Sequence, residues 1–252
     1  MTQPQRIALI SDIHGNVSAL TAVLADIDTR GIETIYNLGD VAGKGPRGSA
    51  AIRLSQQRCA VTIGGNWDDF LPDVQPTDSE PLRWWREELS PADRQWLRDL
   101  PLVYDLMLSG RRIRLFHASA QSVYTRVWSQ HTLEEFDGMF AATELTGPGP
   151  APDLVAYGDI HETFLKVADS RTLLNVGSVG NSLDEPTAAY AILEGTPGEG
   201  RAALGIQCVR VPYDVEAEIA VATSLDMPTT ATYAIELRTA VYRGLHAERG
   251  LA

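Results

Sequence analysis

The chain has 252 residues, of which 44% are hydrophobic, and a formal net charge of −12. This is enough to bury a sizeable core in one large α/β domain or two small ones. The acidic balance argues against an extended nucleic-acid surface, which needs a basic patch. Cys59 and Cys208 are far apart, so neither a disulfide framework nor a thiolate metal site is predicted. The N-terminus lacks the apolar core of a signal peptide and no span is long enough to cross a membrane, so we expect no membrane partner and a cytoplasmic location.

The first predicted elements are a short buried strand over residues 7–10 and a helix over residues 17–27. Between them stand Asp12 and His14, in the sequence Ser-Asp-Ile-His-Gly-Asn. We expect both in a turn at the carboxyl edge of a sheet, where the ligands of open α/β sheets collect. A lone Asp-x-His is more often a helix cap and a hydrogen-bonded histidine. A carboxylate and an imidazole that point the same way are also two corners of a divalent-metal site.

The same arrangement recurs twice in the next fifty residues. A strand over residues 33–38 leads to Asp40, and a strand over residues 59–63 leads to Gly-Gly-Asn-Trp-Asp, which includes Asn66. A single Gly-Asp or Gly-Asn is usually a turn. Three strands that each end in Asp or Asn, alternating with helices, favour a shared site over isolated turns.

Residues 71–101 interrupt the alternation with two predicted helices, the second capped by Ser90. We interpret this pair as a helical insertion or cap beside the site, within a single domain that spans residues 1–252. A hairpin over residues 102–116 then leads to His117. A capping box at Thr132 predicts a helix through about residue 142.

The second half of the chain is rich in strands. A strand over residues 153–157 ends in Gly-Asp-Ile-His, which places Asp159 and His161 at another strand end. An alternating first half and a strand-rich second half predict two packed sheets with helices outside. The further expected strands cover residues 165–168, 172–176, 188–193 and 203–211, and the terminal helices residues 215–225 and 232–245.

Oxygen and nitrogen donors therefore gather at the ends of the predicted strands. They exceed what one ion takes from a protein while keeping an open position, and they suit two ions roughly 3.5–4 Å apart that share a carboxylate. The donors are Asp12, His14, Asp40, Asn66, His117, Asp159 and His161.

The order of these motifs resembles the calcineurin-like metallophosphoesterases. The matching motifs are Asp12-x-His14, Gly39-Asp40, Gly65-Asn66-x-Asp68, His117 and Gly158-x-x-His161. Residues 174–180 and 189–193 resemble the small bacterial and archaeal phosphodiesterase branch. The resemblance covers essentially the whole chain, and its specificity lies in the ordered set.

The resemblance implies a four-layer α-β-β-α sandwich and a centre of two divalent metal ions. One ion would be held by Asp12, His14, Asp40 and His161. The other would be held by Asp40, Asn66, His117 and Asp159, with Asp40 bridging. Manganese is favoured, and iron, zinc, nickel and magnesium remain alternatives. The implied reaction is in-line attack of a metal-bridging hydroxide on a phosphoester.

The resemblance also suggests the residues that contact the substrate. Asn66 and Asp68 are the candidate catalytic residues. Asn66 would donate to the phosphate, while Trp67, Lys44 and Arg47 are candidates for further substrate contacts. For Lys44 and Arg47, a solvated loop is an equally good interpretation. The expected partner is a small phosphoester, and homo-oligomer formation stays open.

Two positions depart from the family pattern. The family usually reads Gly-Asn-His at the third motif, and that histidine protonates the leaving oxygen, but here Trp67 occupies its place. The family also usually reads Gly-His-x-His at the fifth motif, where this chain has Asp159. An active phosphoesterase, acting on phosphodiesters or activated monoesters, is therefore weighed against a metal-centred binding or regulatory protein with little or no turnover.

Overall fold

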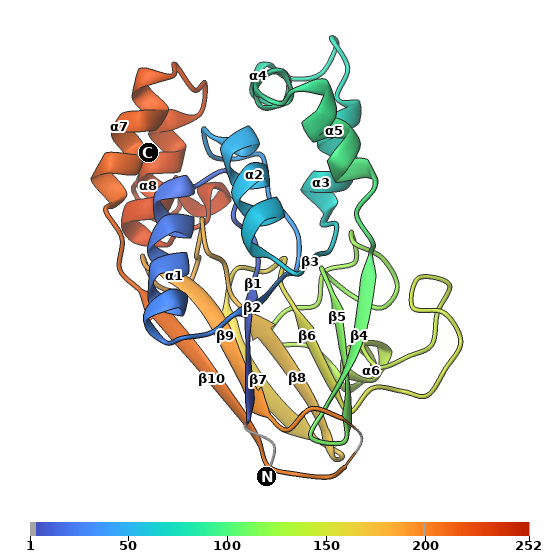
Figure 1. Ribbon diagram of the computed structural model, residues 1–252. Coiled ribbons are helices and arrows are strands. Elements are labelled where there is room, and N and C mark those ends of the chain that lie inside the picture. The colour runs from blue at the N-terminus through green and yellow to red at the C-terminus, as the bar shows by residue number, and fades with distance from the viewer. Residues whose placement is uncertain (1–3, 199, 252) are drawn as a thin grey trace.

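Two five-stranded sheets form the frame of the protein in the computed structural model, which describes residues 4–198 and 200–251 (Figure 1). The strands of the first sheet are β1 (Gln5–Ile10), β2 (Thr34–Asn37), β3 (Val61–Thr62), β9 (Ala188–Gly195) and β10 (Leu204–Val211). Those of the second are β4 (Val103–Leu108), β5 (Arg111–Phe116), β6 (Leu154–Tyr157), β7 (Thr163–Ala168) and β8 (Arg171–Val176). Their orders are β10-β9-β1-β2-β3 and β4-β5-β6-β8-β7.

Each sheet is mixed: the parallel strands lie at one side of the first sheet and in the middle of the second. In the first sheet β1, β2 and β3 run parallel, and in the second β5, β6 and β8 do. Every strand expected from the sequence is present, with ends shifted by a few residues. The helices are α1 (Val17–Thr29), α2 (Gly48–Arg58), α3 (Asn66–Phe70), α4 (Glu80–Glu88), α5 (Pro91–Arg98), α6 (Leu133–Gly138), α7 (Val215–Ser224) and α8 (Thr230–Thr239).

Side-chain alternation along β1 shows how the layers are assembled. Ile7 and Leu9 point into an apolar cluster shared by the two sheets. Ala8 and Ile10 point the other way, into a cluster shared with the helices. Because successive strand residues face opposite sides, a strand with both faces buried is a continuous apolar run.

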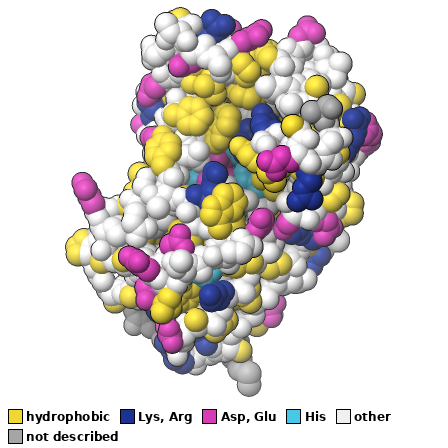
Figure 2. All heavy atoms as spheres, turned by 180° about the vertical axis from the view of Figure 1, so that it is seen from behind, with side chains coloured by type: hydrophobic (Ala, Val, Ile, Leu, Met, Phe, Trp, Pro, Cys, Tyr) yellow, Lys and Arg dark blue, Asp and Glu magenta, His cyan; other side chains and the backbone are white. Residues whose placement is uncertain are grey.

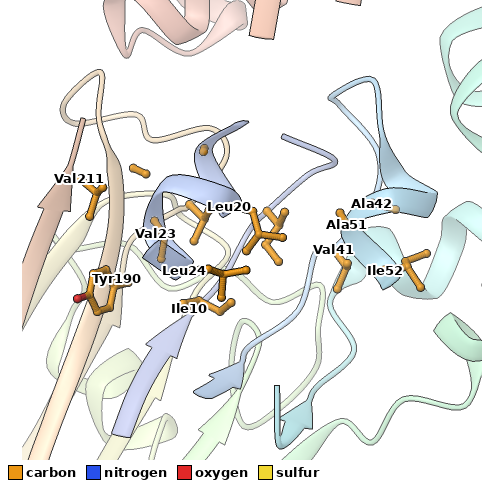
Figure 3. Close-up of a cluster of buried hydrophobic side chains, with 14 of the residues drawn as sticks. Ile10, Leu20, Val23, Leu24, Val41, Ala42, Ala51, Ile52, Tyr190 and Val211 are labelled. Atoms are coloured by element: carbon orange, nitrogen blue, oxygen red, sulfur yellow. The ribbon is translucent and has the colours of Figure 1, made fainter. Parts of the chain in front are cut away.

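The helix-side cluster joins the outer face of the first sheet to α1 and α2. Figure 3 shows Leu20, Val23 and Leu24 of α1 close to Ile10 of β1, with Ile52 of α2 beyond them. The spacing of the α1 residues places them on one face of the helix. Burial of this face against β1 fixes where α1 begins, and therefore where the turn before it lies.

The outer face of the second sheet is covered by α6 and the loops around it. Phe136 of α6 packs with Val155 and Tyr157 of β6 in a third buried cluster. The layers are therefore helix, sheet, sheet and helix, and the predicted four-layer sandwich is confirmed. Helix α6 is shorter than expected and ends after Gly138.

Two further features shape the end of the molecule near α2. In Figure 1, α4 and α5 lie together beside α2 and α3, at the end of the sheets. Helix α8 ends at Thr239, earlier than predicted, because Ala240 adopts a left-handed φ of 55°. The chain then forms a short 3-10 helix, Arg243–Leu245.

Within the described ranges, no helix has the length and apolar character needed to cross a membrane.

Candidate metal centre

The turns that follow β1, β2, β5 and β6 meet at one end of the sandwich. The amide of His14 donates to the carbonyl of Asp40 over 2.9 Å, so the turns after β1 and β2 run side by side. The amide of Gly158 donates to the carbonyl of His117 over 2.8 Å, which joins the turns after β5 and β6. The amide of Asp159 donates to Asp12 Oδ2 over 3.0 Å and connects the two sheets. The strand ends thus meet as the sequence predicted.

The backbone at these turns is unusual. The five residues that follow the strand ends have φ between 48° and 65°, in the left-handed region. Side chains other than glycine enter this region at a cost of roughly 1–3 kcal/mol each, and such residues cluster at functional sites. Asp and His tolerate it better than most residues. The residues are Asp12, His14, Asp40, Asp159 and His161.

Glycines allow these turns to approach one another. A Cβ atom on Gly65 would lie 2.2 Å from Asp40 Oδ1, and one on Gly158 would lie 2.4 Å from Asp12 Oδ2. Neither distance is compatible with a side chain. Gly65 and Gly158 therefore allow the donor loops to pack closely against each other.

Three of the donors form a first group around Asp12 Oδ1. His161 Nε2 lies 3.2 Å and His14 Nε2 lies 3.7 Å from this oxygen. The two Nε2 atoms lie 3.2 Å from each other. All three side chains are buried. Their donor atoms converge within the distance over which one cation can contact them all.

A second group surrounds Asp40. His117 Nε2 lies 3.4 Å from Asp40 Oδ1 and 3.1 Å from Asn66 Oδ1. The other oxygen of Asp40, Oδ2, lies 3.5 Å from His14 Nε2 in the first group. Asp12, Asp40 and His117 also converge tightly enough to share a cation. Asp40 therefore faces both groups, as expected of a bridging ligand.

Two observations show that these residues fit divalent cations. Asp12 Oδ1 is buried and forms no hydrogen bond with the described residues, although two Nε2 atoms face it. The Nδ1 atoms of His117 and His161 face the carbonyl oxygens of Leu38 and Asn181. A histidine that donates from Nδ1 to a carbonyl presents an Nε2 lone pair to a metal, which is the usual outer-shell arrangement of metal-binding histidines.

The electrostatics of the two groups differ. Burial, followed by repulsion from the Lys44 ammonium, lowers the pKa of His14 well below its usual value. Burial also lowers the pKa of His117, but the combined attraction of Asp40, Asp12 and Asp159 outweighs it and raises that pKa to about 10. A cation between the carboxylates would replace the attraction that a proton on His117 provides.

Comparison with known proteins agrees with this geometry. The profile of the calcineurin-like phosphoesterase superfamily domain matches residues 6–197. An uncharacterized protein of Methanocaldococcus jannaschii is 27% identical over 229 residues, which are 83% of this chain and 88% of that protein. The chain belongs to the calcineurin-like phosphoesterase superfamily. Members of this superfamily typically bind two divalent metal ions.

Solved structures share the fold. A metallophosphoesterase from Sphaerobacter thermophilus superposes with a TM-score of 0.70 at 22% identity, covering 94% of this chain and 99% of that one. A hypothetical protein from Pyrococcus horikoshii superposes with a TM-score of 0.70 at 17% identity, covering 95% and 98%. The two donor groups of this calcineurin-like phosphoesterase chain thus sit on a fold found in both bacteria and archaea.

Asp159 is not placed as the resemblance to the superfamily implied. Its carboxylate accepts two hydrogen bonds from Arg126, at 2.8 and 2.9 Å, and joins neither converging group. A paired guanidinium satisfies both carboxylate oxygens and competes with an ion for them. The ligand position that the sequence assigned to Asp159 is therefore corrected. Arg126 was missed because it stands 33 residues before Asp159 in an irregular loop, with no local motif.

The two basic candidates for substrate contact are separated by the structure. Lys44 reaches the centre, with Nζ 3.2 Å from His161 Nε2. The Arg47 guanidinium instead pairs with Glu218 of α7 and donates to Ser18 Oγ over 3.0 Å. Glu218 is fully buried and captures the guanidinium away from the donors. The structure thus pairs Arg47 with α7 and does not support its predicted substrate contact.

Trp67 and Asp68 are both at the centre, in different roles. The Trp67 ring packs edge-on against His14, with centroids 5.7 Å apart, and against Trp85, with centroids 5.4 Å apart. Asp68 accepts amide hydrogen bonds from Asp40 and Val41, at 2.7 and 2.9 Å. Burial and the neighbouring Asp40 raise the pKa of Asp68 to about 7. Asp68 thus holds the Asp40 loop rather than partnering an acid at position 67.

Proposed function

We propose that this protein is a metal-dependent phosphoesterase that hydrolyses phosphodiesters or activated monoesters with two divalent ions. The observation that supports this most directly is the convergence of buried carboxylates and imidazoles, with an unpartnered Asp12 Oδ1 facing two Nε2 atoms. We call Asp12, His14, Asp40, Asn66, His117 and His161 the inner donors.

The inner donors would hold one ion at Asp12, His14, Asp40 and His161 and the other at Asp40, Asn66 and His117, with Asp40 shared by both. When bound, the ions would supply Lewis acidity toward a water molecule and toward the phosphoryl oxygens. The inner donors comprise three oxygen-bearing side chains and three imidazoles, a mixed set that suits manganese as well as iron, zinc and nickel.

The chain's own residues would bind and orient the phosphoester. Lys44 places an ammonium 3.2 Å from His161 Nε2, within reach of a phosphoryl oxygen beside the first group. The Asn66 amide lies at the N-terminus of α3, beside His117. These groups would fix the ester before reaction. Positioning of this kind, together with electrostatic stabilisation, accounts for most of the catalysis of phosphoryl transfer by proteins.

A direct test is turnover of an aryl phosphodiester with added manganese. We expect hydrolysis by the wild type and none by Asp40→Ala, which serves as the blank. Elemental analysis of both proteins accompanies the assay. Equal turnover in the two proteins would contradict the proposal.

A second candidate function is a metal-centred binding protein with little or no turnover. Trp67 favours it, because indole has no titratable proton to give to a leaving oxygen. A placed general acid is typically worth roughly 10²–10⁴ in rate. Tight manganese binding without turnover of any aryl phosphodiester or monoester would favour the binding protein over the phosphoesterase.

A further inference from the structure

A pocket of about 620 Å³ adjoins the metal centre on the side of the C-terminal segment. Lys44 and His161 line both the pocket and the centre, so the two spaces are continuous. This volume is within the range of small-molecule sites. On the face drawn in Figure 2, histidine side chains are visible near the middle, with Lys or Arg side chains and hydrophobic side chains beside them.

Two aromatic side chains line this pocket and remain exposed. Trp128 is 46% exposed and Tyr242 is 52% exposed. The Arg126 guanidinium lies over the Trp128 ring, 5.2 Å from its centroid, while its bonds to Asp159 fix its own position. Trp128 is therefore held at the pocket by a side chain that is itself anchored to the centre. Large exposed aromatic rings in a concave site are suited to stacking on a flat ring.

The ion pairs of the pocket leave more positive than negative charge unpaired, although the chain as a whole is acidic. Asp159 pairs with Arg126 and Asp184 pairs with Arg210, whereas Glu162 accepts a hydrogen bond from Ser129 and keeps its charge. Over the described ranges, neither Lys44 nor Arg249 has a carboxylate within ion-pair distance. These two cations outnumber the one acidic side chain without an ion pair, Glu162, and such an excess favours an anionic ligand.

The wall that carries Tyr242 and Arg249 is fixed to the metal centre. Glu236 of α8 is buried and pairs with Arg243, just after Tyr242. Glu236 also accepts a hydrogen bond from the side chain of Asn181, whose carbonyl faces His161 Nδ1. This wall lies beyond residue 197, where the match to the superfamily profile ends. Its chemistry thus belongs to the C-terminal segment rather than to the matched domain.

We propose that this pocket binds the part of the substrate that carries an aromatic ring and a negative charge of its own, as a nucleoside phosphate does. The ring would stack at Trp128 and Tyr242, and the charge would be met by Arg249 and Lys44. The inference rests on the proposed phosphoesterase function and assigns its substrate class: phosphoesters of a nucleotide.

The test is binding of three probes to the manganese-loaded full chain, measured by calorimetry. The probes are adenosine 5′-monophosphate, adenosine and ribose 5-phosphate. We expect the nucleotide to bind tightest. Trp128→Ala weakens the binding of the nucleotide and of adenosine about tenfold, in line with base stacking, and leaves the binding of ribose 5-phosphate unchanged. Arg249→Ala weakens the binding of the nucleotide and of ribose 5-phosphate about tenfold and leaves the binding of adenosine unchanged.

Matched variants separate the pocket from general effects. Trp128→Phe retains an aromatic face and restores most of the nucleotide affinity. Arg201→Ala removes an exposed arginine that pairs with Asp153 outside the pocket, and it leaves the affinity for all three probes unchanged. Nucleotide affinity that is equal in wild type, Trp128→Ala and Arg249→Ala would overturn the inference. So would a nucleotide that binds no better than ribose 5-phosphate.

Failure here is distinguishable from failure of the proposed function. If the wild type hydrolyses the aryl phosphodiester but Trp128→Ala binds the nucleotide normally, the function stands and the pocket assignment is wrong. If no aryl ester is hydrolysed while Trp128 and Arg249 still control nucleotide binding, the pocket stands as a binding site and the phosphoesterase proposal fails.

Discussion

The inner donors and the side chains around them follow different rules. The inner donors come from strand ends, and nearly all are buried and converge within a few ångströms. The surrounding side chains Trp67, Arg126 and Asp159, which we call the rim, depart from the superfamily pattern or were not foreseen. We therefore expect the inner donors to govern metal binding, and the rim to influence which esters are cleaved and how tightly the second ion is held.

Asp40→Ala is expected to have the largest effect on the metal centre. Asp40 faces both groups through its two oxygens, so its loss leaves neither ion properly held. We expect activity to fall by more than the roughly 10²–10³ that loss of one electrostatic contact costs. We also expect elemental analysis to find fewer than two tightly bound ions per chain.

The matched variant on the rim is Asp159→Asn. Because Arg126 holds both oxygens of Asp159, we expect this variant to keep two ions per chain and most of the activity. Loss of an ion from Asp159→Asn would show that this carboxylate ligates the metal in the loaded protein. Two tightly bound ions in Asp40→Ala would refute the bridging role of Asp40.

The difference between the two regions also explains what could be predicted from the sequence. Asp12, His14 and His161 follow apolar strands within a few residues, so local patterns indicate both their type and their place at the sheet edge. Arg126 and Asp159 meet across 33 residues, and Arg47 and Glu218 across 171. No periodicity encodes such pairs, because they depend on how loops and helices pack in three dimensions.

The same distinction applies to the fold. The strands were predictable because buried strands are continuous apolar runs between turn residues. The end of α8 was not, because Ala240 stops the helix through a left-handed backbone conformation that its residue type does not signal. This early stop makes the turn that presents Tyr242 to the pocket.

Trp67→His restores on the rim the histidine that the family usually has at this position. A placed general acid is worth roughly 10²–10⁴ for a poor leaving group and little for an aryl oxide. We expect alkyl phosphoesters to gain rate far more than aryl ones, with the gain at the low end of this range. Asp68 is committed to the amides of Asp40 and Val41 and offers little support to a histidine.

Kinetics on one matched pair of aryl and alkyl esters decide the role of Trp67. Wild-type protein that cleaves both at comparable rates would show that another group supplies the proton. If KM rises in Trp67→His for aromatic substrates alone, the indole of Trp67 instead stacks on the aromatic part of the substrate.

Arg126→Ala tests whether the rim restrains the second ion. Removal of the guanidinium frees a nearly buried carboxylate beside Asp12, and an added cation then has an additional charge to attract it. Changes in the surroundings of metal ligands alter affinity by roughly 10–100-fold. We expect manganese to bind the second site about tenfold more tightly at the low end of this range.

Calorimetric titration with manganese measures this change. Arg171→Ala is the control, since Arg171 pairs with Asp137 near α6, away from the centre. Weaker or unchanged binding in Arg126→Ala, with both ions present, would show that Asp159 cannot turn toward the metal.

The smallest effect on activity is expected from Arg47→Ala. The sequence made Arg47 a candidate for the phosphate, but its guanidinium pairs with the buried Glu218 and donates to Ser18. Its removal leaves a buried carboxylate without its ion-pair partner, which costs roughly 3–5 kcal/mol of unfolding free energy. Urea unfolding should show this loss, while KM and kcat for an aryl phosphodiester stay within about twofold of wild type. The double variant Arg47→Ala with Glu218→Gln should recover part of the stability, because the unpaired charge is gone. A several-fold rise of KM in Arg47→Ala at unchanged stability would instead place this guanidinium on the substrate and return Arg47 to the site.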